Sequence, residues 1–122
     1  MPNVRQTRFV IAVHDLEKSA AFYRDVLGFD VHTIPHPGFL FFVAGNCTIW
    51  AGRCPDALSP SELGDHSYFA YLEIDDIDAY YESVCAKGAR VGKPICDEPW
   101  GMREFGIVTA DGHRIMFASS IV

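Results

Sequence analysis

Histidine is the side chain in this sequence best suited to hold a metal ion or to move a proton near neutral pH, and the chain has five. His32 and His36 are four residues apart, a spacing that would place both imidazoles on one face of a helix. Pro35 and Pro37 stand on either side of His36, and prolines at these positions interrupt a helix. The pair therefore does not predict a metal site.

The other three histidines fall next to predicted strands and turns. His14 ends a strand, His66 precedes one, and His113 follows the glycine of a turn. Such positions favour solvated or loop-anchoring histidines over metal ligands. A displaced metal site that combines His14, His66 and Glu104 is the alternative hypothesis.

Two carboxylates lie within predicted strands. Strand alternation places Glu73 on the same face as Phe69 and Tyr71, and it places Glu104 on the same face as Met102. In a cavity, either carboxylate could pair with a cation or act as a general base. Ordinary surface statistics favour solvated positions near the strand ends for both.

Two arginines are candidate partners for these carboxylates. Arg8 could pair with an acid that points into the same cavity. Arg103 precedes Glu104 directly, so an Arg–Glu brace of the hairpin is a further interpretation. The residues alone leave these interpretations open.

An internal repeat determines how these residues are positioned. Residues 8–31 and 68–91 each predict a strand, a helix that starts at an aspartate, and a second strand. Asp15 corresponds to Asp76, and Gly28 corresponds to Gly88. Two copies of one small α+β unit follow from this pattern.

The full pattern predicts the order βαβββ twice, within one domain of residues 1–122. The first repeat, about 8–51, has strands at 8–14, 30–33, 39–44 and 47–51 and a helix from Asp15 to Gly28. A linker at 52–66, either a lid or a spacer, leads to the second repeat, about 67–119. That repeat has a strand at 67–74, a helix to about 86, a short strand at Val91, a loop at 94–100, and a hairpin of 102–110 and 113–119 around Asp111–Gly112.

Two groups of helix residues have predicted structural roles. Asp75, Asp76 and Asp78 are expected to supply the N-cap and favourable first-turn charges of the second helix. The aromatic side chains on the helices are expected to pack in the core; they are Phe22, Tyr23, Tyr80 and Tyr81.

Composition narrows the classes of function. Of 122 residues, 49% are hydrophobic and 21% are charged, which is typical of a globular domain. The net charge of −6 argues against nucleic-acid binding and is compatible with a neutral or cationic ligand. No apolar run is long enough to span a bilayer, and the first ten residues lack the core of a signal peptide, so we expect a cytoplasmic protein with reduced cysteines.

Two motifs carry a resemblance to a known family. The run D-L-E-K-S-x-x-F-Y-x-x-V-L-G-F begins at Asp15, and the tail W-G-x-R-E-F…D-G-x-x-x-x-F begins at Trp100. With the βαβββ order, they resemble the glyoxalase/bleomycin-resistance/dioxygenase superfamily, also called vicinal oxygen chelate proteins, and most of all its bleomycin-resistance-like branch. The resemblance implies an eight-stranded curled mixed sheet that forms a cup, with helices outside, and a homodimer.

Metal enzymes of that family place one His or Glu from each of four strands in the cup. The matching positions in this sequence are Arg8, Trp50, Phe69 and Met116. Arginine has no lone pair to give, the two aromatic side chains do not ligate, and methionine is a soft, weak ligand for hard divalent ions. We therefore expect no metal and no other cofactor.

The resemblance then implies a cup for apolar and stacking contacts. We expect metal-independent binding or sequestration of a small, partly aromatic molecule. The candidate ligand-binding residues are Arg8, Trp50, Phe69, Tyr71, Trp100, Met102, Glu104 and Met116. One alternative is a metal-dependent lyase, isomerase or dioxygenase with displaced ligands, and another is a degenerate cup whose surface matters instead.

Overall fold

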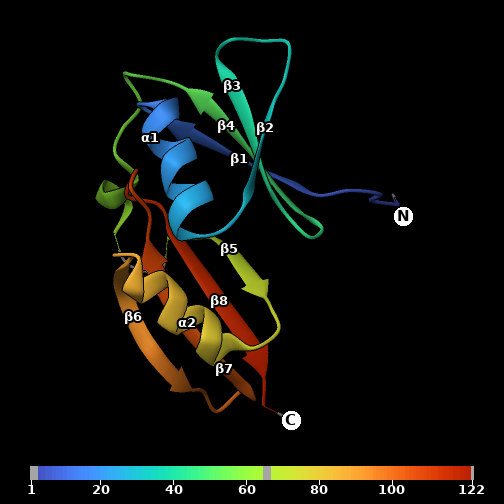
Figure 1. Ribbon diagram of the computed structural model, residues 1–122, viewed down its shortest axis with the longest axis vertical. Coiled ribbons are helices and arrows are strands. Elements are labelled where there is room, and N and C mark those ends of the chain that lie inside the picture. The colour runs from blue at the N-terminus through green and yellow to red at the C-terminus, as the bar shows by residue number, and fades with distance from the viewer. Residues whose placement is uncertain (1–2, 65–66, 122) are drawn as a thin grey trace. The chain divides into compact units, whose positions relative to one another are not determined.

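The order of elements repeats in the computed structural model, which describes residues 3–64 and 67–121 (Figure 1). The first repeat consists of β1 (Arg8–Val13), α1 (Leu16–Ala21), η1 (Phe22–Val26), β2 (Asp30–Thr33), β3 (Phe39–Ala44) and β4 (Cys47–Arg53). The second consists of β5 (Tyr68–Glu73), α2 (Ile77–Ala86), β6 (Arg90–Asp97), β7 (Met102–Val108) and β8 (Arg114–Ser120), after a short 3-10 helix, η2 (Pro60–Leu63). The predicted α+β class with two βαβββ repeats is confirmed.

Each repeat builds one four-stranded mixed sheet, and the two sheets have the same strand order. The orders are β1-β4-β3-β2 and β5-β8-β7-β6. In each sheet the first strand runs parallel to the last, and the other pairs are antiparallel. The chain divides into two compact units, residues 1–57 and 58–122, and the boundary falls inside the predicted linker.

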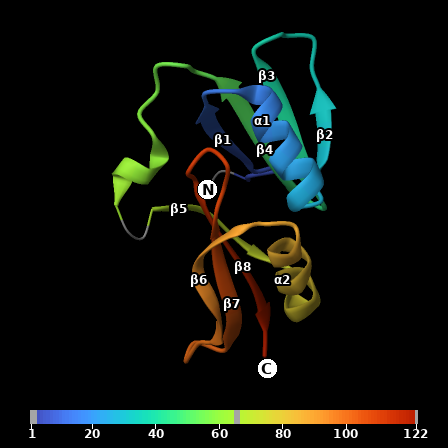
Figure 2. The same cartoon turned by 60° about the vertical axis from the view of Figure 1, so that its left-hand side comes forward.

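A single helix covers one face of each sheet. Figures 1 and 2 show α1 beside the first sheet and α2 beside the second. α1 contacts β3 and β4, and α2 contacts β6, β7 and β8. No helix in the described part of the chain is long and apolar enough to cross a membrane.

The core of the first unit lies between α1, η1 and the sheet. Tyr23 is fully buried and stacks on Phe42 with the ring centroids 4.3 Å apart. The helix begins after Asp15, as predicted, and Asp15 caps it, because its carboxylate accepts hydrogen bonds from the amides of Glu17 and Lys18 at 3.0 and 3.2 Å. The predicted helix forms over residues 16–26, and its second half is the π-helical η1.

The core of the second unit lies between α2 and its sheet. Phe105 and Phe117 are stacked 5.5 Å apart, and both are buried. The ring centroids of Tyr80 and Phe117 lie 5.0 Å apart, and those of Tyr81 and Phe105 lie 4.8 Å apart. The predicted packing role of the helix aromatics is confirmed.

The start of α2 differs from the prediction. Asp76 occupies the N-cap position, but its side chain makes no capping hydrogen bond, and its backbone is left-handed at φ 52°. Asp78 in the first turn instead accepts a hydrogen bond from Arg103 at 2.9 Å. The acidic run therefore supplies first-turn charge without a side-chain cap.

β6 is longer than the sequence predicts. The expected loop at 94–100 begins only after Asp97, and Pro94 lies inside the strand. β6 is an edge strand, where a proline can turn its missing N–H group away from the neighbouring strand. Its pairing with β7 shifts register between Val91 and Lys93, and again between Lys93 and Cys96.

Candidate functional site

A polar cluster lies on the face of the second sheet that is turned away from α2. Register places Tyr71 of β5 beside Met116 of β8, then Gly106 of β7, then Lys93 of β6. Glu104 lies two residues from Gly106 along β7, so both share this face. We call the following six residues the Glu104 cluster: Tyr71, Lys93, Cys96, Glu98, Trp100 and Glu104.

Glu104 is at the centre of this cluster and is only 2% exposed. One carboxylate oxygen, Oε1, accepts hydrogen bonds from Tyr71 Oη at 2.7 Å and from Trp100 Nε1 at 3.0 Å. The other oxygen, Oε2, accepts one from Lys93 Nζ at 2.7 Å. The expected solvated position of Glu104 is therefore wrong, because three donors from β5, β6 and the β6–β7 turn replace water.

Lys93 connects Glu104 to a second carboxylate. Its Nζ also donates to Glu98 Oε1 at 2.7 Å, and Cys96 Sγ donates to the same oxygen at 2.9 Å. The Nζ atom lies 5.9 Å from the centroid of the Trp100 ring, within the range of a cation–π contact. Two carboxylates share one ammonium, so the cluster has a net charge of −1.

The β6–β7 turn presents Trp100 and Glu98 together. The amide of Gly101 donates to the carbonyl of Glu98 at 3.0 Å, and the amide of Glu98 donates to the carbonyl of Met102 at 2.7 Å. Pro99 fixes one of the two central positions of this turn. The turn therefore holds the indole of Trp100 close to the carboxylates.

The hydrogen bonds keep Glu104 and Lys93 ionised near neutral pH. Burial alone would raise the pKa of Glu104, but the donors Lys93, Tyr71 and Trp100 outweigh it and lower that pKa. Burial would likewise lower the pKa of Lys93, but its bonds to Glu104 and Glu98 raise it. A carboxylate with a lowered pKa is a poor proton acceptor, so the geometry favours binding over the general-base role considered for Glu104.

Two aromatic rings of the cluster face solvent. Trp100 is 62% exposed and Tyr71 is 49% exposed, although the polar atom of each is bonded to Glu104. Burial and the bond to Glu104 both raise the pKa of the Tyr71 phenol, so it stays protonated as a donor. The arrangement offers fixed ring surfaces on which a flat molecule can stack.

The structure brings together three predicted residues, Tyr71, Trp100 and Glu104, and adds Lys93, Cys96 and Glu98. The added residues lie on or next to β6, whose residues 94–97 the sequence predicts as part of a loop. Alternation in β6 could have pointed to Lys93, but the two register shifts disturb that pattern. The predicted Arg103–Glu104 brace is wrong, because Arg103 pairs with Asp78 at 2.9 Å and with Asp97 at 3.0 Å.

The methionines and Phe69 have different surroundings. Met102 is half-buried on the strand of Glu104, and Met116 is 8% exposed and paired with Tyr71. Phe69 contacts the His113 ring edge-to-face at 5.7 Å. The uniform alternation predicted for this strand is wrong, because a bulge shifts its register between residues 68 and 70.

The remaining predicted residues, Arg8 and Trp50, belong to the first unit. The exposed Arg8 donates to Gln6 Oε1 at 3.2 Å. Trp50 packs edge-to-face against Phe39 and Phe41, with ring centroids 5.7 and 5.3 Å apart. This aromatic group lies on the sheet face away from α1, because Trp50 alternates with the buried Ile49 and Ala51.

The four side chains that the resemblance matches to the family's metal positions, Arg8, Trp50, Phe69 and Met116, do not fit a divalent cation. A guanidinium, two aromatic rings and a thioether provide no hard oxygen or imidazole donor. Within residues 3–64 and 67–121, no three His, Cys, Asp or Glu side chains are grouped to hold a metal ion. His14 has the predicted anchoring role, since its Nε2 donates to the carbonyl of Ala57 at 2.7 Å, whereas His66 lies outside the described residues.

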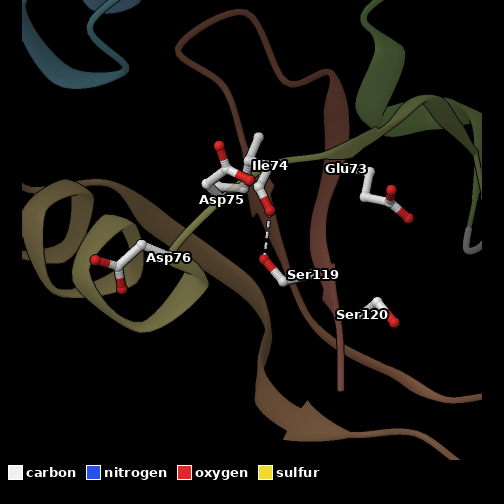
Figure 3. A pocket seen from close by; sticks show the side chains of 6 residues that line it. All are labelled: Glu73, Ile74, Asp75, Asp76, Ser119 and Ser120. Atoms are coloured by element: carbon white, nitrogen blue, oxygen red, sulfur yellow. Dashed lines mark hydrogen bonds between the residues drawn. The ribbon is translucent and has the colours of Figure 1, made fainter. Parts of the chain in front are cut away.

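A hollow outside the Glu104 cluster lies at the end of β5 (Figure 3). It has a volume of about 420 Å³ and is lined by Glu73, Ile74, Asp75, Asp76, Ser119 and Ser120. Ser119 Oγ donates to the carbonyl of Ile74. Glu73 is exposed, as predicted, and the largely polar lining suits water better than an aromatic ligand.

Comparisons with known proteins agree with this architecture. The residue pattern of the Glyoxalase/Bleomycin resistance protein/Dioxygenase superfamily matches residues 5–117. A bleomycin resistance protein from Geobacillus stearothermophilus is 28% identical over 128 aligned residues, which cover 91% of this chain and 93% of that protein.

Two solved structures share the fold. TioX from Micromonospora sp. ML1 aligns with a TM-score of 0.78 and 20% identity over 97% of this chain and 100% of that one. TnmS3, an antibiotic binding protein from Streptomyces sp. CB03234, aligns with a TM-score of 0.75 and 23% identity over 98% of both chains.

Proposed function

Because this chain belongs to the Glyoxalase/Bleomycin resistance protein/Dioxygenase superfamily, we propose that it binds or sequesters a small, partly aromatic molecule without a metal ion. The ligand would occupy the cup-shaped cavity that the family resemblance implies. A bleomycin resistance protein among its relatives and an antibiotic binding protein among its structural neighbours support binding as the general activity.

The observation that carries the proposal is the pair of solvent-facing rings fixed to one buried carboxylate. Tyr71 and Trp100 present their ring surfaces while Glu104 holds their polar atoms. Rings that are already oriented lose little conformational freedom on binding, so more of the stacking energy appears as affinity. Metal independence is supported by the donor chemistry at Arg8, Trp50, Phe69 and Met116.

The experiment is a screen of small aromatic molecules, bleomycin included, against chelator-treated protein, with heat stability as the readout. A ligand that stabilises the protein is then titrated calorimetrically into Trp100→Ala and Tyr71→Ala variants. We expect each variant to bind about tenfold more weakly, because each loses one stacking surface.

Leu58→Ala is the matched control, since Leu58 is 78% exposed and lies outside the cluster. It should bind like the wild type. Equal affinities for the wild type and both ring variants would contradict the proposed site.

We also propose that the protein acts as a homodimer, as the family resemblance implies. Light scattering coupled to size-exclusion chromatography measures the molar mass directly. A mass near twice 13.6 kDa is expected, and the mass of one chain would contradict the dimer.

A further inference from the structure

The Glu104 cluster already holds one ammonium group, that of Lys93. Its Nζ lies 2.7 Å from an oxygen of Glu98 and 2.7 Å from an oxygen of Glu104. The Trp100 ring lies 5.9 Å away. Charged hydrogen-bond acceptors beside an indole face are features that recognise ammonium ligands in proteins. An alkylammonium group therefore fits this position.

The net negative charge of the cluster favours binding of a cationic ligand. With Lys93 in place, two carboxylates still outnumber one ammonium. Oxygen Oε2 of Glu98 accepts no hydrogen bond from the described residues, so one acceptor of the cluster is available. The Glu98 side chain is 16% exposed, and solvent can therefore reach it.

The position of Lys93 allows its ammonium group to move away from Glu98 and Glu104. Its side chain is 27% exposed, and it lies on an edge strand with a register shift on each side. Exchange of one ammonium for another leaves the number of buried charges unchanged. The large desolvation cost of burying an additional charge is thereby avoided.

We propose that the Lys93 ammonium is an internal stand-in for a primary ammonium group of the ligand, which exchanges with it while the aromatic part stacks on Trp100 and Tyr71. The inference rests on the proposed function and names its ligand class as aromatic amines. An aliphatic amine gains no stacking that offsets displacement of the tethered lysine. Lys93 is thus a specificity-determining residue.

The test uses tryptamine and tryptophol, which share an indole and differ in an ammonium or a hydroxyl group. Both are titrated by NMR into the wild-type protein, Lys93→Ala and Lys87→Ala. Lys87 is an exposed lysine after α2, so the two variants change the net charge equally. We expect the wild type to bind tryptamine about tenfold more tightly than tryptophol.

Lys93→Ala removes the internal competitor, so its affinity for tryptamine should rise by about a further tenfold. Its affinity for tryptophol should not rise, and Lys87→Ala should match the wild type. Equal gains in both lysine variants would overturn the inference, because overall charge would then explain them.

A second measurement needs no variant. The NMR signal of the ion-paired Lys93 ammonium in the wild type should shift with tryptamine and stay unchanged with tryptophol. A signal that tryptamine leaves unchanged overturns the exchange. Equal affinity for both compounds overturns the inference but supports the proposed function. Absence of binding by either compound overturns the inference alone, because the screen of aromatic molecules tests the proposed function separately.

Discussion

At the scale of single residues, one buried carboxylate organises the candidate site. Glu104 accepts three hydrogen bonds from side chains on three separate segments. Two of the donors, Tyr71 and Trp100, have solvent-facing rings, and the third, Lys93, carries a charge. A buried carboxylate without such donors would cost several kcal/mol, so the donors and Glu104 depend on one another. The carboxylate therefore serves both stability and the orientation of the rings.

Replacing Glu104 tests this role in stability. Glu104→Gln places an amide group opposite Lys93 and removes the charge that Lys93 neutralises. We expect the free energy of unfolding to fall by about 1–3 kcal/mol, measured by urea denaturation. Glu73→Gln is the control, because Glu73 is exposed, and should change it by less than about 0.5 kcal/mol. Equal losses in the two variants would contradict the central role of Glu104.

The same carboxylate predicts how stability depends on pH. The pKa of Glu104 in the folded protein lies below its ordinary value of 4.5. Its stabilising contribution is therefore complete above that pH and is lost as the pH falls through the folded pKa. The difference in unfolding free energy between wild type and Glu104→Gln should shrink in acid below pH 4.5. A constant difference down to full protonation would show that the charge of Glu104 does not matter.

At the scale of elements, patterns along the chain predicted the strands of the first repeat well and β6 poorly. Residues 30–33 and 39–44 form the strands expected, because alternation and turn residues mark their ends. Pro94 indicated a loop, but an edge strand tolerates a proline and the shifts around Lys93 conceal the alternation. The site residues that the sequence did not predict are Lys93, Cys96 and Glu98, and they lie on β6 or in the β6–β7 turn.

The two helix starts offer a comparison within one molecule. Asp15→Ala removes two capping hydrogen bonds and should lower the free energy of unfolding by about 0.5–2 kcal/mol. Asp76→Gly removes none, and relief of the left-handed backbone should offset the lost attraction to the helix dipole. Thermal unfolding followed by circular dichroism measures both. A larger loss in Asp76→Gly than in Asp15→Ala would contradict the observed caps.

At the scale of the whole molecule, the repeat determines the topology. The second sheet reproduces the strand order of the first, as the paired positions of Asp15 with Asp76 and Gly28 with Gly88 predict. All six residues of the Glu104 cluster belong to the second repeat. Phe41 of the first repeat pairs with Trp50, and Gly106 at the corresponding position of the second repeat pairs with Met116. Two sheets of the same strand order therefore carry different side chains. The sequence repeat predicts the strand order of the two sheets. It does not predict the side-chain hydrogen bonds, because these depend on bulges and register shifts that differ between the repeats.

The central claim is that the protein binds an aromatic small molecule through Tyr71 and Trp100 without a metal ion. The most direct measurement is a calorimetric titration of one ligand from the screen into chelator-treated protein and into protein supplied with divalent metals. Equal affinities in both preparations are predicted. Binding that appears only after a metal is restored would contradict the claim and would indicate a metal site with displaced ligands.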